Sequence, residues 1–254
     1  MVIISQVQPL DGQMKILGIL IALFVVPLVY ANQLIIGASP LNPPFSRLSD
    51  AEQQLMGFDI DVMTAVCSRI KADCKFVPVP FDDLFMQLEA GKIDLAISAI
   101  IITPEREANY LFSIPYMNSN GRFFAPFDSK LNTFDDIQSK KVGVRAGSPY
   151  KELATVLYND NVTVKEYDIV NDLFSALENG DIDVGLMDNE CAIYWNANYN
   201  NTFKLIGNRL PVGKGYGIMA KRGTDDLILK INQALSDMKA DGTLVKIYGD
   251  YFDL

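Results

Sequence analysis

The sequence predicts an α/β protein made of two similarly built halves. Short apolar runs typical of buried strands alternate with segments of helical periodicity, which is the pattern of a parallel sheet joined by crossover helices. In addition, the residues from Asp83 to Asp94 recur from Asp172 to Asp183, with eight identities in twelve positions at a constant offset of 89. Helix–glycine–strand units are common in α/β proteins, but so close a match favours two lobes, each pointing a strand end at a shared cleft.

The first copy of this repeat belongs to a longer unit that ends at Arg106. Residues 82–89 have helical spacing, Gly91 stands where a helix C-terminal cap is expected, and residues 93–97 are apolar enough for a strand covered on both faces. Thr103 then provides an N-cap, and a proline follows at the first helical position. Arg106 is therefore expected at a helix N-terminus beside a strand end, where an anion would meet its guanidinium and free backbone N–H groups.

The remaining elements follow in the order expected of two lobes. In the first half we expect strands at 33–38 and 75–79, a proline-rich loop at 39–46 and an amphipathic helix after Gly57. In the second half we expect a linking strand at 122–126, a short helix at 134–137, strands at 141–145 and 162–167, and a strand ending at Asp188. Residues 211–220 would return to the first lobe, where a helix at 225–238 would pack. The predicted division is a first lobe at 32–121 and 211–254 and a second lobe at 122–210.

Composition and charge exclude several classes of function. The net charge of −9 and the lack of a basic cluster disfavour a nucleic-acid partner. The chain has no histidine, which excludes Ser-His-Asp and Cys-His catalysis, and it carries no phosphate-binding loop motif. Acid pairs occur at 59/61, 82/83 and 135/136, all at predicted helix starts. We interpret them as surface groups that complement the helix dipole, and we expect no catalytic pair.

The segment from Met14 to Ala31 is typical of a secretory signal peptide. Lys15 provides the positive start, an apolar run follows, and the segment ends in a small-x-small cleavage pattern. The run is shorter than a membrane helix requires, although an uncleaved anchor remains an alternative. We therefore expect residues 1–31 to contain a signal peptide, with Met14 as the true initiator, and we expect the mature protein to be exported.

Export makes a disulfide possible between Cys67 and Cys74. The two residues stand seven positions apart, so a bridge would close a short loop and add about 2.5 kcal/mol to the free energy of unfolding on the loop-entropy model. A metal site is the alternative, and the absence of histidine and of closely spaced cysteine pairs makes it the weaker one. Cys191 remains unpaired and is expected to be buried.

Three residues outline a binding site. Arg106 could hold a carboxylate, Asp188 at a strand end of the other lobe could accept from an ammonium group, and Phe81 could provide an aromatic surface. Together they would recognise a zwitterion. Each also has a structural interpretation: a salt bridge between Arg106 and a nearby acid, a helix N-cap for Asp188, and core packing for Phe81.

A family resemblance favours the binding interpretation. The motifs PPFS, GFDIDV, Cys-x6-Cys, FDDL, AGKID, ITPER and FSIPYM occur in order between Asn42 and Met117, followed by KVGVRAGSPY, LFSALENGDIDVGLMDNE and DGTLVKIYGDYF. In this order the chain resembles the polar amino-acid-binding proteins of ABC importers, solute-binding family 3. The resemblance covers the mature chain and implies a type II periplasmic binding protein fold with a two-strand hinge. The cysteine pair resembles that of the lysine-, arginine- and histidine-binding members.

The resemblance also implies roles for single residues. Arg106 would bind the α-carboxylate of the ligand and Asp188 its α-ammonium group, while Phe81 would stack on the ligand side chain. Ser98 and Ser148, the latter in the loop after Gly147, would add polar contacts.

At several positions the chain departs from the family pattern. Ser39 replaces an acid of the basic-amino-acid binders, Asn42 replaces an aromatic residue, and Ile101 replaces a hydroxyl residue. Pro149 stands where a Thr is usual. Arg145 stands at a position that lines the side-chain pocket and would repel a cationic ligand if it points inward. The ligand is therefore expected to be a polar amino acid, with a basic, an amide and an acidic side chain all left open.

The predicted function is that of a monomeric periplasmic binding protein that closes on a free amino acid and delivers it to an inner-membrane ABC permease, without a cofactor or metal. Closure would require contacts from both lobes at once. The enzymatic alternative is a periplasmic cyclohexadienyl or arogenate dehydratase on the same fold. A sensor module is a second alternative.

Overall fold

The computed structural model describes residues 33–49, 53–198 and 202–252. The predicted signal peptide therefore lies outside the described residues. Within these ranges no helix has the length and apolarity needed to cross a membrane. The described residues belong to one compact unit, which contains two five-stranded sheets and one small three-stranded sheet.

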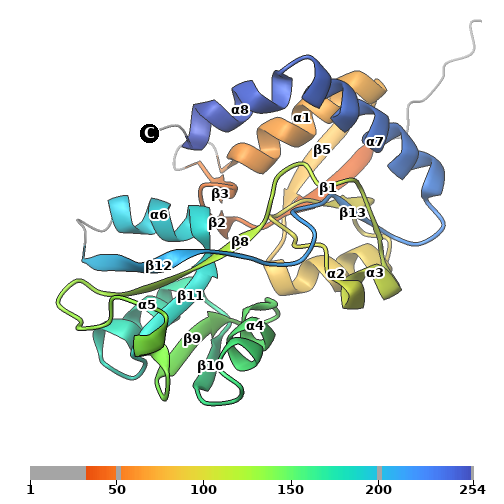
Figure 1. The fold of residues 1–254 in the computed structure, drawn as a ribbon. Helices are drawn as coiled ribbons and strands as arrows, with labels where there is room; N and C mark the ends of the chain where they lie inside the picture. Colours follow the sequence, from red (N-terminus) through yellow and green to blue (C-terminus); the bar gives the residue numbers. More distant parts are fainter. Residues whose placement is uncertain (1–32, 50–52, 199–201, 253–254) are drawn as a thin grey trace, which may run out of the picture. The chain divides into compact units, whose positions relative to one another are not determined.

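The first large sheet has the strand order β5-β1-β6-β13-β7 (Figure 1). Its strands are β1 (Leu34–Ala38), β5 (Cys74–Pro78), β6 (Leu95–Ala96), β7 (Leu111–Phe112) and β13 (Met219–Ala220). The pairs of β1 with β5 and β6 are parallel, as predicted, whereas β13 pairs antiparallel with β6 and β7. Strand β13, in the segment that follows the second half of the chain, thus lies between β6 and β7 and completes the first sheet.

The second large sheet has the order β10-β9-β11-β8-β12. Its strands are β8 (Asn120–Pro126), β9 (Lys141–Arg145), β10 (Thr163–Tyr167), β11 (Val184–Asp188) and β12 (Phe203–Pro211). Strand β9 pairs in parallel with β10 and β11, while β8 pairs antiparallel with β11 and β12. The small sheet contains β2 (Leu41–Asn42), β3 (Ser46–Leu48) and β4 (Leu55–Met56).

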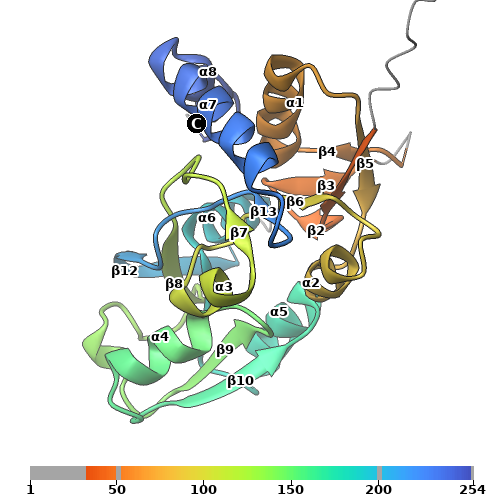
Figure 2. The ribbon, with the colours of Figure 1, turned by 90° about the vertical axis from the view of Figure 1, so that its right-hand side faces the viewer.

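Helices cover both large sheets. Figures 1 and 2 show α1, α7 and α8 grouped on one side of the first sheet and α2 on the other, while α4, α5 and α6 pack against the second. The bounds are α1 (Phe58–Ile70), α2 (Phe81–Glu89), α3 (Pro104–Asn109), α4 (Tyr150–Leu157), η1 (a 3₁₀ turn, Asp135–Ile137), α5 (Val170–Glu178), α6 (Asn189–Asn198), α7 (Asp225–Ala240) and α8 (Thr243–Phe252). The predicted α/β architecture of two sheets flanked by helices is confirmed.

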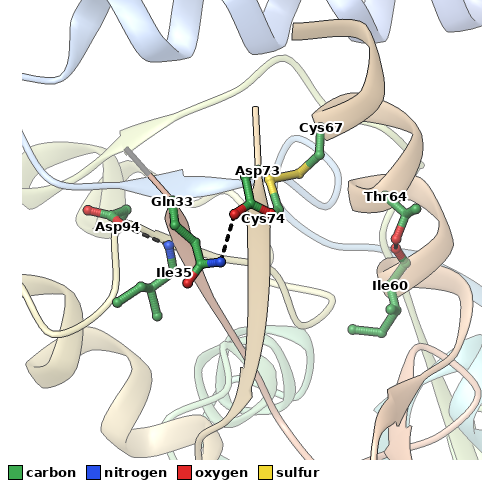
Figure 3. Close-up of a disulfide and its surroundings, with 8 residues drawn as sticks. All are labelled: Gln33, Ile35, Ile60, Thr64, Cys67, Asp73, Cys74 and Asp94. Carbon is green, nitrogen blue, oxygen red and sulfur yellow. Dashed lines mark hydrogen bonds between the residues drawn. A yellow bond between two sulfur atoms is a disulfide. The ribbon is translucent and has the colours of Figure 1, made fainter. Parts of the chain in front are cut away.

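The sequence repeat corresponds to a repeated structure. The carboxylate of Asp94 accepts the backbone N–H of Ile35 at 2.7 Å (Figure 3), and that of Asp183 accepts the N–H of Lys141 at 2.8 Å. Each aspartate thereby joins the turn after its helix to a neighbouring strand of its own sheet, β1 in the first and β9 in the second. The turn glycines of both copies have positive φ, 66° at Gly91 and 74° at Gly180. The repeated residues therefore build two equivalent helix–turn–strand units.

The GFD and PPF motifs contact each other at the start of α1. Backbone N–H groups of Phe58 and Asp59 donate to the carbonyls of Pro44 and Phe45, at 3.1 and 2.9 Å. A Cβ at Gly57, whose φ is 132°, would lie 2.4 Å from the Phe45 carbonyl oxygen, so only glycine allows this approach. These bonds satisfy otherwise free N–H groups of the helix and hold the loop that carries Asn42.

Several predicted boundaries were wrong. The buried segment 93–97 contributes only the two paired residues of β6, because the chain leaves the ladder at Ile97 to form the loop that leads to α3. The loop predicted at 39–46 contains β2 and enters β3. Strand β12 was not predicted as an element, whereas the segment DGTLVKIYGDYF, which resembles the C-terminal helix of the family, forms α8. The lobe boundaries at 32–121, 122–210 and 211–254 stay predictions.

Cys67 and Cys74 form a disulfide with a Cα–Cα distance of 6.3 Å (Figure 3). It joins the last turn of α1 to the first residue of β5. The predicted bridge is therefore present, and Cys191 is free and buried, as expected.

Candidate ligand-binding site

A cavity of about 40 Å³ lies where strands of both large sheets end. Strands β6, β9 and β11 each lead into it, which is the edge where α/β sheets bind ligands. Its lining consists of Leu41, Asn42, Phe81, Ser98, Ala99, Ile101, Arg106, Arg145, Ser148, Pro149, Tyr150, Val170, Leu173, Met187, Asp188, Cys191 and Trp195.

Arg106 extends from the first turn of α3, the short helix whose N-cap Thr103 accepts the Arg106 backbone N–H. Its guanidinium donates to the carbonyl of Ile101 at 2.7 Å and to that of Gly147 at 2.9 Å. Burial lowers the pKa of Arg106, and the charge of Asp188 opposes that effect. Arg106 forms no ion pair with any described residue, so the geometry does not favour the salt-bridge interpretation.

Asp188 is the last residue of β11. Its Oδ1 atom accepts the hydroxyl protons of Tyr150 and Tyr216, both at 2.7 Å. Burial raises the pKa of Asp188, and the two tyrosine hydroxyls together with the charge of Arg145 oppose this rise. Because both hydroxyls converge on Oδ1, they fix the carboxylate at the cavity wall.

Phe81 begins α2 and presents its ring to two guanidinium groups. The Cζ atom of Arg145 lies 4.4 Å from the ring centroid, and that of Arg106 lies 5.9 Å from it. Both distances lie within the range of cation–π attraction. The ring expected to stack on a ligand side chain thus already contacts Arg145, which comes from the end of β9 in the other sheet.

Ser98 and its neighbours are held by a buried acid. Asp59 accepts the N–H of Ala99 at 2.6 Å and the hydroxyl of Tyr116 at 2.8 Å, and its side chain is fully buried. The interpretation of Asp59 as a surface group was therefore wrong: the start of α1 packs beneath the Ser98–Ile101 segment. Burial raises the pKa of Asp59 to about 7.

Ser39 does not line the cavity. It is buried, its N–H donates to Ser98 Oγ at 3.3 Å, and its own Oγ accepts the N–H of Leu41. Ser39 therefore supports the loop that carries Asn42. Asn42 itself accepts a hydrogen bond from the Cys191 thiol, with 3.6 Å between the sulfur and oxygen atoms.

The structure brings together eight of the nine residues that the sequence singled out for the ligand. Ser148 lines the cavity, although its hydroxyl donates to the Arg145 carbonyl at 2.6 Å. Ile101 contributes its side chain to the wall and its carbonyl to Arg106. Sequence reasoning missed Tyr150 and Tyr216, although Tyr150 ends the KVGVRAGSPY motif and Tyr216 lies in the predicted return segment 211–220. The ligand-binding roles of the nine residues that the sequence singled out stay predictions.

The lining contains no set of metal ligands. Among the described ranges, no group of three or more His, Cys, Asp or Glu side chains is placed to hold a metal ion. The charged side chains at the cavity are instead two arginines and one aspartate, from both halves of the protein, which suits a small charged organic ligand.

Comparisons with known proteins agree with this geometry. Residues 34–254 match the model of the bacterial extracellular solute-binding proteins, family 3. The chain is 31% identical to the ABC transporter arginine-binding protein 1 of Escherichia coli, over 93% of this chain and 98% of the relative.

Solved structures are similar as well. A periplasmic binding protein of an arginine transport system from Legionella pneumophila is 42% identical, with a TM-score of 0.82 over 87% of this chain and 99% of that one. An ancestral arginine-binding protein bound to glutamine is 33% identical, with a TM-score of 0.77 over 87% and 97%. The chain therefore belongs to family 3 of the bacterial extracellular solute-binding proteins.

Proposed function

We propose that this protein is the periplasmic substrate-binding component of an amino-acid ABC importer. The observation that carries the proposal is that Arg106 and Asp188, which carry opposite charges and come from the two halves of the protein, line the same cavity. A free amino acid carries a carboxylate and an ammonium group on one carbon, so it is the small ligand that satisfies both charges at once. Each charged hydrogen bond contributes about 1.5–3 kcal/mol of net binding free energy.

The ligand would be bound by closure of the two halves. Arg106 and Phe81 come from the first half, while Arg145, Ser148 and Asp188 come from the second. Because contacts from both halves are needed, binding favours the closed arrangement, and a permease could recognise that arrangement. The names of the relatives, which are binding proteins for arginine transport, support an amino-acid ligand and do not favour the dehydratase alternative.

The direct test is a thermal-shift screen of the purified mature protein against the twenty amino acids, followed by calorimetry. A ligand at 100 times its Kd stabilises the folded state by about 2.7 kcal/mol, so a specific ligand is visible as a raised Tm. Binding of at least one amino acid with unchanged ligand recovered after denaturation supports the proposal. Conversion of prephenate or arogenate, with no amino acid bound, would overturn it in favour of the enzyme.

A further inference from the structure

The Arg145 side chain is part of the cavity lining. It ends strand β9, and its guanidinium lies over the Phe81 ring at 4.4 Å from Cζ to the centroid. A flat cation on an aromatic face is a favourable arrangement, so Arg145 already takes the place that a cationic ligand side chain would need on Phe81. A second guanidinium, that of Arg106, lies 5.9 Å from the same ring centroid.

Arg145 is unusual because its donors have no acceptor. An arginine side chain has five N–H donors, yet none of the side-chain hydrogen bonds between described residues comes from the Arg145 guanidinium. Its Nε atom is buried without a partner. By contrast, Arg106, which lines the same cavity, donates to two carbonyls. A buried donor without an acceptor costs free energy, and a ligand acceptor beside Arg145 would remove that cost.

The charges of the lining residues also favour a ligand whose side chain ends in an acceptor. Arg106 and Arg145 are positive and Asp188 is negative, so the lining carries one unbalanced positive charge. The α-carboxylate and α-ammonium of an amino acid cancel each other, which leaves this charge for the side chain to meet. A second cation would add to it, whereas a carboxylate would neutralise it and an amide would offer a carbonyl acceptor.

Asp82 moderates this charge without cancelling it. Asp82 has the largest of the charge interactions that favour the protonated form of Arg145, followed by Asp188. The Asp82 side chain is exposed and is not part of the cavity lining, so solvent weakens its influence. The positive charge of the lining therefore persists, and an anionic or a neutral acceptor on the ligand suits Arg145 better than a cation does.

We propose that Arg145 is the residue that determines specificity, and that it selects amino acids whose side chain ends in a hydrogen-bond acceptor, an amide or a carboxylate, over those that end in a cation. This inference rests on the proposed amino-acid binding. It assigns to this chain a ligand class different from the arginine in the names of its relatives.

The test uses two ligands of nearly the same shape. Citrulline and arginine differ only in that a ureido oxygen replaces one nitrogen of the guanidinium, which changes a cation into a neutral acceptor. Calorimetry would measure the affinity of the mature wild-type protein for citrulline and arginine, and also for glutamine, glutamate and lysine. We expect citrulline to bind at least tenfold more tightly than arginine, and glutamine or glutamate at least tenfold more tightly than lysine.

The variant Arg145→Met removes the charge and the donors while keeping most of the length. It should shift the ratio of citrulline to arginine affinity towards arginine by at least tenfold, and Arg145→Gln provides a second variant should the first fail to fold. The proposal would be overturned if the wild-type protein bound arginine more tightly than citrulline. It would also be overturned if the ratio of citrulline to arginine affinity were the same in the folded variants as in the wild type. Binding of no amino acid at all would instead show that the proposed function itself is wrong.

Discussion

The guanidinium of Arg106 donates to the carbonyl oxygen of Gly147 at 2.9 Å, and this bond joins the first half of the protein to the loop after β9 in the second. The residue expected to hold the ligand carboxylate thus also links the two halves. A guanidinium has five N–H donors, so a ligand carboxylate can accept from Arg106 while the bonds to Ile101 and Gly147 are kept.

Replacing Arg106 should abolish ligand binding without unfolding the protein. Arg106→Met removes the guanidinium but keeps much of the side-chain volume, so we expect a loss of affinity of about 100-fold or more, from charged hydrogen bonds. Calorimetry with the ligand found in the screen measures the affinity, and circular dichroism measures the fold.

Lys214→Met is the matched control for Arg106. Lys214 also lies beside α3, where it pairs with Glu107 at 2.6 Å on the surface, but it does not line the cavity. Its replacement should leave the affinity unchanged. Affinity equal to wild type in the Arg106 variant would show that this arginine has only a structural role.

Asp188→Asn separates the charge of Asp188 from its hydrogen bonds to tyrosine. The amide oxygen can still accept from Tyr150 and Tyr216, so we expect stability to change by about 1 kcal/mol at most. The neutral side chain cannot pair with an ammonium group, and affinity should fall at least tenfold. Asp181→Asn, at an exposed position, serves as the control. Undiminished affinity for an amino acid in the Asp188 variant contradicts the assigned role.

Asp59 should make the protein less stable as pH rises from about 4 to 7. Its folded-state pKa is raised from 3.8 to about 7, mainly by burial, so the folded protein keeps a proton that the unfolded chain releases. Because the unfolded state then binds fewer protons, this group lowers the free energy of unfolding by up to about 1.4 kcal/mol per pH unit within that window, and not above it.

Asp59→Asn tests this expectation. The amide oxygen can accept the Ala99 N–H, and its NH₂ group can donate to the Tyr116 hydroxyl, so the fold should be retained. Urea unfolding at several pH values should give a shallower fall in stability for the variant than for wild type. Parallel pH profiles would mean that Asp59 keeps an ordinary pKa.

Loss of the Cys67–Cys74 bridge should lower the free energy of unfolding by about 2.5 kcal/mol, since the bridge closes a short loop in the unfolded chain. The double variant Cys67→Ser, Cys74→Ser measures this in urea, and a reducing agent should then have no further effect on it. An equal stability of oxidised wild type and the double variant would contradict the expectation.

The sequence by itself determined the parts that depend on local pattern. The Asp83–Asp94 repeat identified two equivalent units because the helix, the positive-φ glycine turn and the strand that follow one another in each copy are encoded in adjacent residues. Thr103 and Pro104 identified the start of α3 for the same reason. The motifs around Arg106 and Asp188 likewise named the residues that line one cavity, since strand ends in an α/β sheet converge there.

Only the tertiary structure decided how these residues are partnered. No spacing in the sequence reveals that Tyr150 and Tyr216 both donate to Asp188, because they stand 38 and 28 positions away from it. The packing of α1 likewise buries Asp59, which accepts the Ala99 N–H beneath the cavity instead of facing solvent. The position of Arg145 over Phe81 joins two different sheets, and this contact carries our inference about the ligand. Such contacts depend on how the two halves pack, which local propensity does not encode.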